Sequence, residues 1–196
     1  MANVPRNYTT RGAPSRLPAM RLFVGIALSA GTLAELAPLV AQMKPKITGW
    51  RWSEPESWHI TLQFLGTTGV DQYSRLIPQL RAIRSPKVPV QLGGLGVFDR
   101  TGIFFVDVQV SPQLADLQKL VTSATAPCGF VAESRPYHPH ITLARFEGKN
   151  RAQNLPDTSA PAPPFSGFIA SEFLLYESVL APAGDRYAVR GRFPLI

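Results

Sequence analysis

The chain has 196 residues, which is enough for one hydrophobic core or two small lobes that share one, and its 45% hydrophobic and 17% charged residues are ordinary for a soluble globular protein. Its single cysteine, Cys128, excludes an internal disulfide and a cysteine-ligated metal cluster, and it is consistent with a reducing cytoplasm. The net charge of +7 divides into +3 from residues 1–19 and +4 from the remaining 17 basic and 13 acidic residues, an excess that favours polyanionic partners such as RNA.

Residues 1–19 are predicted to form a disordered extension, or to result from an upstream start before a natural beginning at Met20. The apolar run "LFVGIALSA" that follows has two interpretations, a secretory signal peptide or a buried strand over residues 21–28. Glu35 and Pro38 interrupt the apolar character further on, so no membrane span is expected here.

Two helices and a strand are predicted next. Thr32 and Glu35 have the spacing of a capping box, which predicts a helix from Thr32 to about Gln42. The segment "HITLQFL" at 59–65 alternates between polar and apolar residues and ends at a glycine, as expected for a strand. Residues 71–84 have a helical pattern.

The middle of the chain is predicted to form a hairpin and a helix. The segments "VPVQLGGLGVF" at 88–98 and "GIFFVDVQV" at 102–110 predict two strands joined by a turn at 99–102. Ser111, followed by a proline, is a typical N-cap and predicts a helix that ends near Ala124.

Three strands and a loop complete the chain. "HITLARF" at 140–146 predicts the first strand, the proline-containing segment 147–164 a surface loop, and 167–180 and 186–195 two further strands. The order β-α-β-α-β-β-α-β-β-β argues against an all-parallel sheet and predicts the α+β class. Because each half of the chain carries one "HITL" strand, we expect two similar lobes that face each other.

The string "HITL" occurs twice, at 59–62 and 140–143, and takes two of the three histidines. Side chains two positions apart on a strand point to the same face. In the first strand this rule predicts one face with His59, Thr61 and Gln63 and another with Ile60, Leu62 and Phe64. The second strand has His140 and Thr142 on its polar face, so two imidazoles and two hydroxyls would meet if the strands lie side by side.

Such a group of side chains suits an in-line displacement at phosphorus. One histidine can accept a proton from the nucleophile while the other protonates the leaving oxygen, because an imidazole pKa of about 6.5 allows both roles near neutral pH. The threonine hydroxyls can donate hydrogen bonds to the phosphate oxygens. Two histidines without nearby carboxylates make a poor zinc or magnesium site. A single His-x-Thr pair is usually a half-buried surface pair, and it is the second copy that favours function.

The chain resembles the two-histidine (2H) phosphoesterases and, within them, the RNA 2′,3′-cyclic phosphodiesterases, historically called 2′-5′ RNA ligases. The matching stretches are "MRLFVGIAL" at 20–28, "RWSEPESWHITLQFLG" at 51–66, "LGGLGVF" at 92–98, "ESRPYHPHITLARF" at 133–146 and, more loosely, "FLLYESVLAPAGDRYAVRGRFPL" near the C-terminus. The segment "FDRTGIFF" departs from the family, whose members often have a proline- and arginine-containing stretch before a tryptophan there.

The resemblance implies a single bilobal domain over 20–196, in which two antiparallel sheets with helices face each other across a central cleft that carries both motifs. Because family members begin near Met20, it also implies that the apolar run is a core strand and that the protein is cytoplasmic. The implied protein is a monomeric, metal-independent enzyme without a cofactor. It would hydrolyse the 2′,3′-cyclic phosphate ends of RNA or oligonucleotides to 2′-phosphomonoesters, with a reversible 2′-5′ RNA ligase activity as a side reaction of the same groups.

The family mechanism would make His59 the proton donor to the departing 3′ oxygen and His140 the proton acceptor that activates water. Thr61, Thr142 and Arg145 match positions that bind the phosphate. On a regular strand Arg145 would point away from His140, so a bulge or the end of the strand is expected to turn it inward.

Other residues near the motifs have weaker functional interpretations. His138 is expected at the rim of the site or in a structural role. Four aromatic residues could stack on a base, although such residues more often pack in the core: Trp52, Trp58, Tyr137 and Phe146.

Two other classes of function stay open from the sequence. A non-catalytic RNA-binding module would bind without turnover. A metallohydrolase that uses His138 and His140 with His59 would lose its activity in EDTA. Within the leading class, other cyclic nucleotides, ADP-ribose cyclic phosphate and 2′-5′-linked oligoadenylates are alternative substrates.

Overall fold

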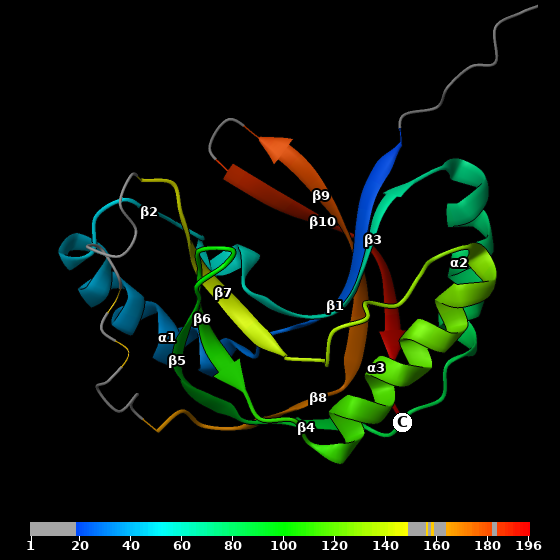
Figure 1. Cartoon of the computed structure of the whole chain (residues 1–196). Helices are drawn as coiled ribbons and strands as arrows, with labels where there is room; N and C mark the ends of the chain where they lie inside the picture. Colours follow the sequence, from blue (N-terminus) through cyan, green and yellow to red (C-terminus); the bar gives the residue numbers. More distant parts are fainter. Residues whose placement is uncertain (1–18, 149–155, 157, 159–163, 182–183) are drawn as a thin grey trace, which may run out of the picture.

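The computed structural model describes residues 19–148, 156, 158, 164–181 and 184–196 (Figure 1). Apart from Ala19, the predicted extension lies outside this part of the chain, and so does most of the predicted surface loop. The α-helices are α1 (Ala30–Met43), α2 (Val70–Ala82) and α3 (Pro112–Thr125). The strands are β1 (Met20–Ala27), β2 (Trp50–Trp52), β3 (His59–Thr68), β4 (Val88–Val90), β5 (Leu92–Phe98), β6 (Ile103–Val108), β7 (His140–Phe146), β8 (Phe168–Ala170), β9 (Glu172–Ala181) and β10 (Gly184–Pro194).

The strands form two four-stranded antiparallel sheets and a small two-stranded one. The first sheet has the order β10-β9-β1-β3, the second has the order β2-β7-β6-β5, and β4 pairs with β8. Helices α2 and α3 lie against one face of the first sheet, and α1 lies beside the second (Figure 1). The predicted α+β class with two antiparallel sheets is confirmed.

Each large sheet contains one of the two "HITL" strands, β3 in the first sheet and β7 in the second, and these strands approach each other. A lobe does not correspond to one half of the chain. The first sheet combines β1 and β3 with the C-terminal strands β9 and β10, whereas the middle of the chain builds most of the second. The first sheet therefore forms only when segments distant in the sequence meet.

Strand β1 lies in the interior of the first sheet, between β9 and β3. Its residues Leu22, Val24 and Ile26 are almost completely buried. The structure therefore shows the strand that was one of the two interpretations of the N-terminal apolar run. In the described part of the chain, no helix has the length and apolar character needed to cross a membrane.

The predicted start of the first helix was wrong by three residues. Ser29 is the N-cap, and its hydroxyl accepts a hydrogen bond of 3.1 Å from the backbone N–H of Thr32. Glu35 does not complete a capping box. Its carboxylate accepts a hydrogen bond of 2.8 Å from the backbone N–H of Ser166, and hydrogen bonding to the side chain and then the backbone of Ser166 lowers the pKa of Glu35. Serine and threonine are both good caps, so spacing alone did not distinguish them.

Two predicted strands are divided in the structure, because a chain can change its pairing partner without changing its extended conformation. The predicted strand 88–98 is divided into β4 and β5, which lie in different sheets, and 167–180 is divided into β8 and β9. At the first division, the Gln91 side chain donates a hydrogen bond of 2.8 Å to the carbonyl of Phe165. The short strand β2 was missed, although Trp50 and Trp52 are its buried positions.

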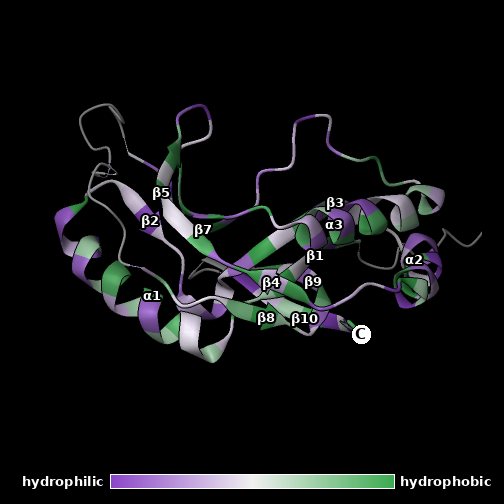
Figure 2. Cartoon of the chain, turned by 90° about the horizontal axis from the view of Figure 1, so that it is seen from below, coloured by the Kyte–Doolittle hydropathy of each residue, from purple (hydrophilic) through white to green (hydrophobic). Residues whose placement is uncertain are grey.

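One hydrophobic core connects the two large sheets. It includes Leu22 and Ile60 of the first sheet and Leu143 of the second. Helix α3 adds Leu117, and hydrophobic and hydrophilic positions alternate along the helices (Figure 2). Because β3 and β7 both contribute to this core, their polar faces are held by packing rather than by loops.

Gly25 allows β1 and β3 to approach each other next to the first histidine. A Cβ atom at this position would lie 2.8 Å from the carbonyl oxygen of Ile60 and 3.6 Å from Cδ2 of His59. We expect Gly25→Ala to lower the free energy of unfolding by about 1–3 kcal/mol, because two backbones would have to separate. Urea denaturation of Gly25→Ala and Gly94→Ala measures this effect. Gly94 has no atom within 4 Å of the added Cβ, so an equal loss in both variants would contradict the explanation.

Candidate active site

Strand β3 places His59 and Thr61 on one face, but the alternation then breaks. Gly25 of β1 pairs with Thr61 and Val24 pairs with Gln63, so Leu62 is an extra residue in β3, a β-bulge. The predicted faces were therefore wrong after Leu62. Gln63 turns into the core, where its side-chain carbonyl accepts a 2.8 Å hydrogen bond from the Thr125 hydroxyl.

Phe64 takes the position that was predicted for Gln63. It pairs with Phe23 of β1, it is 64% exposed, and the two ring centroids are 6.0 Å apart. Phe23 in turn lies 4.5 Å from the imidazole of His59, measured between ring centroids. Phe64 is consequently on the face of His59 and Thr61.

Strand β7 has a β-bulge at the equivalent position. Phe104 pairs with Ala144 and Phe105 pairs with Thr142, so Leu143 is the extra residue, at the position equivalent to Leu62. Ala144 is buried, and Arg145 turns onto the face of His140 and Thr142. The bulge that was predicted for Arg145 is confirmed. Arg145 is close enough to both histidines to lower the pKa of each.

Both catalytic candidates have their imidazoles held in the same way. Nδ1 of His59 is 2.7 Å from the backbone carbonyl of Ser57, and Nδ1 of His140 is 2.8 Å from the backbone carbonyl of His138. A carbonyl oxygen only accepts hydrogen bonds, so Nδ1 carries the proton in both rings. In each neutral ring Nε2 therefore has a free lone pair, and in each charged ring it holds the transferable proton.

Burial is the main electrostatic influence on both imidazoles. It lowers the pKa of His59 to about 4, against the hydrogen bond to Ser57, and the charges of His140 and Arg145 lower it further. Burial also lowers the pKa of His140, whereas the hydrogen bond to the His138 carbonyl and the carboxylate of Asp107 raise it. In the free protein both rings are therefore neutral near pH 7.

Aromatic rings surround His59 on its side of the site. Besides Phe23, Tyr187 packs edge-on with its ring centroid 5.0 Å from that of His59, and Tyr176 lies at 5.7 Å. Tyr176 is buried, and this raises the pKa of its hydroxyl to about 12. These residues were missed in the sequence because they come from β1, β9 and β10, which meet β3 only through the order of the sheet.

Phe98 and Phe105 are the corresponding rings beside His140, at centroid distances of 4.9 and 5.4 Å. His138 is exposed and its Nε2 lies 2.8 Å from a carboxylate oxygen of Asp107, which pairs with His140 across the sheet. His138 therefore lies next to the candidate site, as expected for a rim residue. Asp107 was not singled out in the sequence, since its position depends on the register of β6 and β7.

The four aromatic residues proposed for base stacking are packing residues. Trp52 and Trp58 are only 9% and 4% exposed, which agrees with the packing role that was the favoured interpretation. Phe146 is half-buried and packs edge-on against Trp50. Tyr137 is half-buried as well, and its hydroxyl donates a hydrogen bond of 3.0 Å to the backbone carbonyl of Thr61. This bond links the segment before one motif to the strand of the other.

No group of three potential metal ligands from histidine, cysteine, aspartate or glutamate was found in the described part of the chain. A surface hollow of about 320 Å³ is lined by Pro89, Val110 and Ile169 among others, and it includes neither motif histidine. The predicted central cleft stays a prediction.

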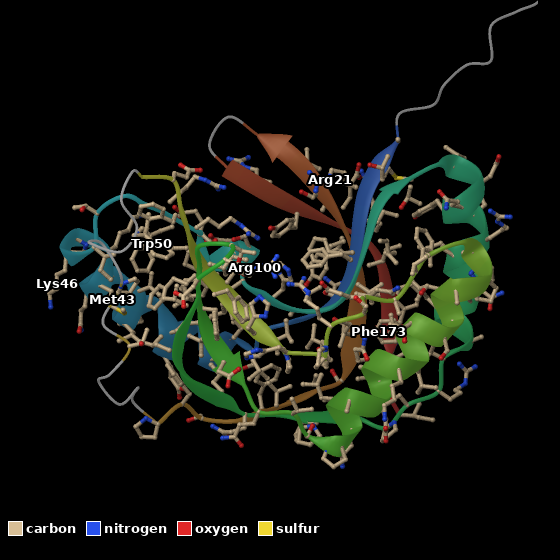
Figure 3. The ribbon with its side chains drawn as sticks, in the orientation of Figure 1. Arg21, Met43, Lys46, Trp50, Arg100 and Phe173 are labelled. Atoms are coloured by element: carbon tan, nitrogen blue, oxygen red, sulfur yellow. The ribbon has the colours of Figure 1, made fainter. Side chains whose placement is uncertain are left out.

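Two exposed arginines add positive charge near the candidate site. Arg21 lies two positions before Phe23 on β1 and therefore on the same face of the sheet, and Arg100 lies in the turn between β5 and β6 (Figure 3). Positive charge near a reactive face raises the local concentration of polyanions.

The fold and the site together define a class of protein in which two antiparallel sheets each present one His-x-Thr strand. The model of the 2′-5′ RNA ligase superfamily matches residues 36–179 of the chain, and the chain belongs to this superfamily.

Named relatives agree with this assignment. A Bacillus subtilis (strain 168) protein called RNA 2′,3′-cyclic phosphodiesterase is 32% identical over 128 residues, which are 63% of this chain and 69% of the relative. The Escherichia coli (strain K12) protein of the same name is 29% identical over 169 residues, 80% of this chain and 92% of the relative. The crystal structure of E. coli LigT complexed with 3′-AMP matches with a TM-score of 0.76 and 28% identity, covering 90% of this chain and 98% of that one.

The shared arrangement of the two histidines can be tested without any substrate. In nitrogen-detected NMR spectra of the imidazoles near neutral pH, we expect neutral rings with the proton on Nδ1 for both His59 and His140, and histidine variants assign the signals. Burial lowers both pKa values, so both rings should titrate below their ordinary value of 6.5, with His59 near pH 4. A proton on Nε2 of either neutral ring, or a midpoint above 6.5, would contradict the described geometry.

Proposed function

We propose that this protein is an RNA 2′,3′-cyclic phosphodiesterase, a hydrolase that opens 2′,3′-cyclic phosphate ends to 2′-phosphomonoesters with two histidines and no metal. The observation that carries this proposal is the pair of imidazoles on β3 and β7, each held through Nδ1 by a backbone carbonyl and both near Arg145. The names of the relatives support the same reaction.

In the proposed reaction His140 acts first as a base. Its Nε2 accepts a proton from water while the water oxygen bonds to phosphorus opposite the 3′ oxygen. The bond between phosphorus and the 3′ oxygen breaks, and Nε2 of His59 donates a proton to that oxygen. The 2′ oxygen keeps the phosphate, so the product is a 2′-phosphomonoester. Joining of RNA ends by a 2′-5′ linkage follows the same steps with a 5′ hydroxyl in place of water as the nucleophile, and cleavage of that linkage back to the cyclic phosphate is the reverse reaction.

Thr61, Thr142 and Arg145 are the proposed ligands of the phosphate. The threonines lie two positions after their histidines on the same strand faces, and the bulge in β7 brings the guanidinium of Arg145 to this side. Hydroxyl and guanidinium donors stabilise the charge that accumulates on the phosphate oxygens during the displacement.

The proton on His59 needs a source of stabilisation, because burial lowers the pKa of this ring to about 4. The bound cyclic phosphate is an anion, and a negative charge beside an imidazole raises its pKa. Substrate binding would therefore stabilise the proton that the reaction requires on His59, and both rings would stay neutral in the free protein.

The rest of the proposal follows the family resemblance. We propose that residues 20–196 act as one bilobal domain, as a monomer in the cytoplasm, and without a cofactor. A core that continues from one large sheet to the other supports the single domain. Light scattering of the purified protein measures the oligomeric state.

Direct assay tests the function. The wild type, His59→Ala and His140→Ala are incubated in EDTA with a short RNA that ends in a 2′,3′-cyclic phosphate, and the terminal phosphate is identified. We expect a 2′-phosphate from the wild type, and a rate lower by roughly a hundredfold or more in each variant, because each loses one proton transfer. His138→Ala serves as the control and should retain most of the activity, since its imidazole lies at the rim.

Each of the other outcomes supports a different function. Loss of wild-type turnover in EDTA alone would favour the metallohydrolase. RNA binding without any ring opening, also with other cyclic phosphates, would favour the non-catalytic module. A 3′-phosphate product would keep the enzyme but reverse the assigned direction of ring opening.

The dependence of kcat/KM on pH is a second test. The reaction needs one histidine with a proton and one without, and both pKa values lie below 6.5 in the free protein. Above the higher of these values, the singly protonated fraction falls about tenfold for each pH unit. We therefore expect kcat/KM to be greatest below pH 6.5 and to fall with this slope above pH 7. An optimum above about pH 7.5 would contradict the lowered pKa values.

A further inference from the structure

Tyr137 connects the two halves of the candidate site by a hydrogen bond. Strand β3, which carries His59 and Thr61, lies at the edge of the first sheet, whereas His140 belongs to the second sheet. The hydroxyl of Tyr137, which comes shortly before His140 in the chain, donates a bond of 3.0 Å to the backbone carbonyl of Thr61. The bond therefore joins the strand of the first histidine to the segment that leads into the second.

The carbonyl of Thr61 points away from the strand that pairs with β3. The preceding carbonyl, that of Ile60, faces β1, since its oxygen would lie 2.8 Å from a Cβ atom at Gly25. Successive carbonyl groups of a strand point to opposite edges, so the carbonyl of Thr61 lies at the outer edge of the sheet. A partly buried carbonyl at such an edge needs a donor, and Tyr137 supplies it.

Packing sets the position of the Tyr137 ring. The ring contacts the hydrophobic core that connects the two large sheets. Burial also raises the pKa of the hydroxyl, so Tyr137 stays protonated and remains a donor over the pH range of an assay. A donor on a ring that is held in place keeps its acceptor at a defined distance and angle.

The chain between Tyr137 and His140 has little freedom. The carbonyl of His138 accepts a bond of 2.8 Å from Nδ1 of His140. Pro139 has a fixed backbone φ angle, and its carbonyl accepts a bond of 3.1 Å from the N–H of Val108 on β6. A displacement of Tyr137 would therefore also displace the carbonyl that orients His140.

We propose that Tyr137 is a positioning residue, which sets where the imidazole of His140 lies relative to Thr61 in the other half of the site. Under the proposed function both groups act on one phosphate, and a displacement of about 1 Å between reacting groups can cost about a hundredfold in rate. The expected effect on the rate rests on the proposed function, whereas the expected effect on the His140 ring rests on the hydrogen bonds alone.

The kinetics of Tyr137→Phe test the effect on the rate. This variant keeps the ring and removes only the hydroxyl. With an RNA that ends in a 2′,3′-cyclic phosphate, we expect kcat to fall about tenfold and KM to change by less than about threefold, because alignment matters most in the transition state. Replacement of Tyr137 by 4-aminophenylalanine, whose amino group can donate to the same carbonyl, should restore most of the rate.

Tyr73→Phe is the matched control. The hydroxyl of Tyr73 on α2 also donates to a backbone carbonyl, that of Arg190, at 3.5 Å. Tyr73 packs against the main core, on the face of the first sheet opposite to Phe23 and His59. An equal loss of kcat in both variants would overturn the inference, because it would show a general effect of a lost hydrogen bond.

Three other kinetic results would also overturn the inference. The first is a wild-type kcat in Tyr137→Phe. The second is a higher KM with an unchanged kcat, which would assign the hydroxyl to substrate binding. The third is a variant with 4-aminophenylalanine that is as slow as Tyr137→Phe, because the missing donor would then not be the cause.

NMR spectra of the protein without substrate separate this inference from the proposed function. The Nδ1 proton of His140 exchanges with water when its bond to the His138 carbonyl opens. We expect this exchange to be about tenfold faster in Tyr137→Phe than in the wild type, and unchanged in Tyr73→Phe. If this result is found in a protein that opens no cyclic phosphate, the positioning of His140 holds and the proposed function fails. Equal exchange rates would overturn the inference even if the wild type is an active phosphodiesterase.

Discussion

The extra residue in each "HITL" strand is the constraint on which the rest of the site depends. A regular strand would send the fifth residue after each histidine into the core, because side chains alternate with a period of two. The bulges at Leu62 and Leu143 let both strands bury these leucines and still present a third side chain on the face of the histidine. Packing thus fixes the reactive face, since Leu62 and Leu143 themselves belong to the core.

The second constraint is the carbonyl group two residues before each histidine. It fixes the tautomer of both rings, so the reactive nitrogen is the same in both, while burial keeps the free rings neutral. A neutral site is easier to fold than one with two buried imidazolium groups next to Arg145, because buried like charges repel each other. The proton needed for acid catalysis would then be stabilised on His59 by the negative charge of the bound substrate.

Much of the fold was predictable, because alternation and N-caps are local signals. The bulge before Arg145 was also predictable, since a residue expected at the phosphate would otherwise point away from it. The same bulge in β3 had no such signal: Gln63 on the polar face and Phe64 in the core agreed with ordinary residue preferences. Phe23, Tyr176 and Asp107 could not be placed from the sequence at all, because their distance from the histidines depends on sheet order and register.

The two halves of the site are similar in backbone and different in chemistry. Each strand supplies a histidine, a threonine and an outward residue after a bulge, but that residue is a cation in β7 and an aromatic ring in β3. A site with two arginines would attract phosphate equally from both sides and would leave the nucleotide without a defined direction. The single arginine makes the two sides unequal, so under the proposed function it would orient the cyclic phosphate and decide which histidine faces the leaving oxygen.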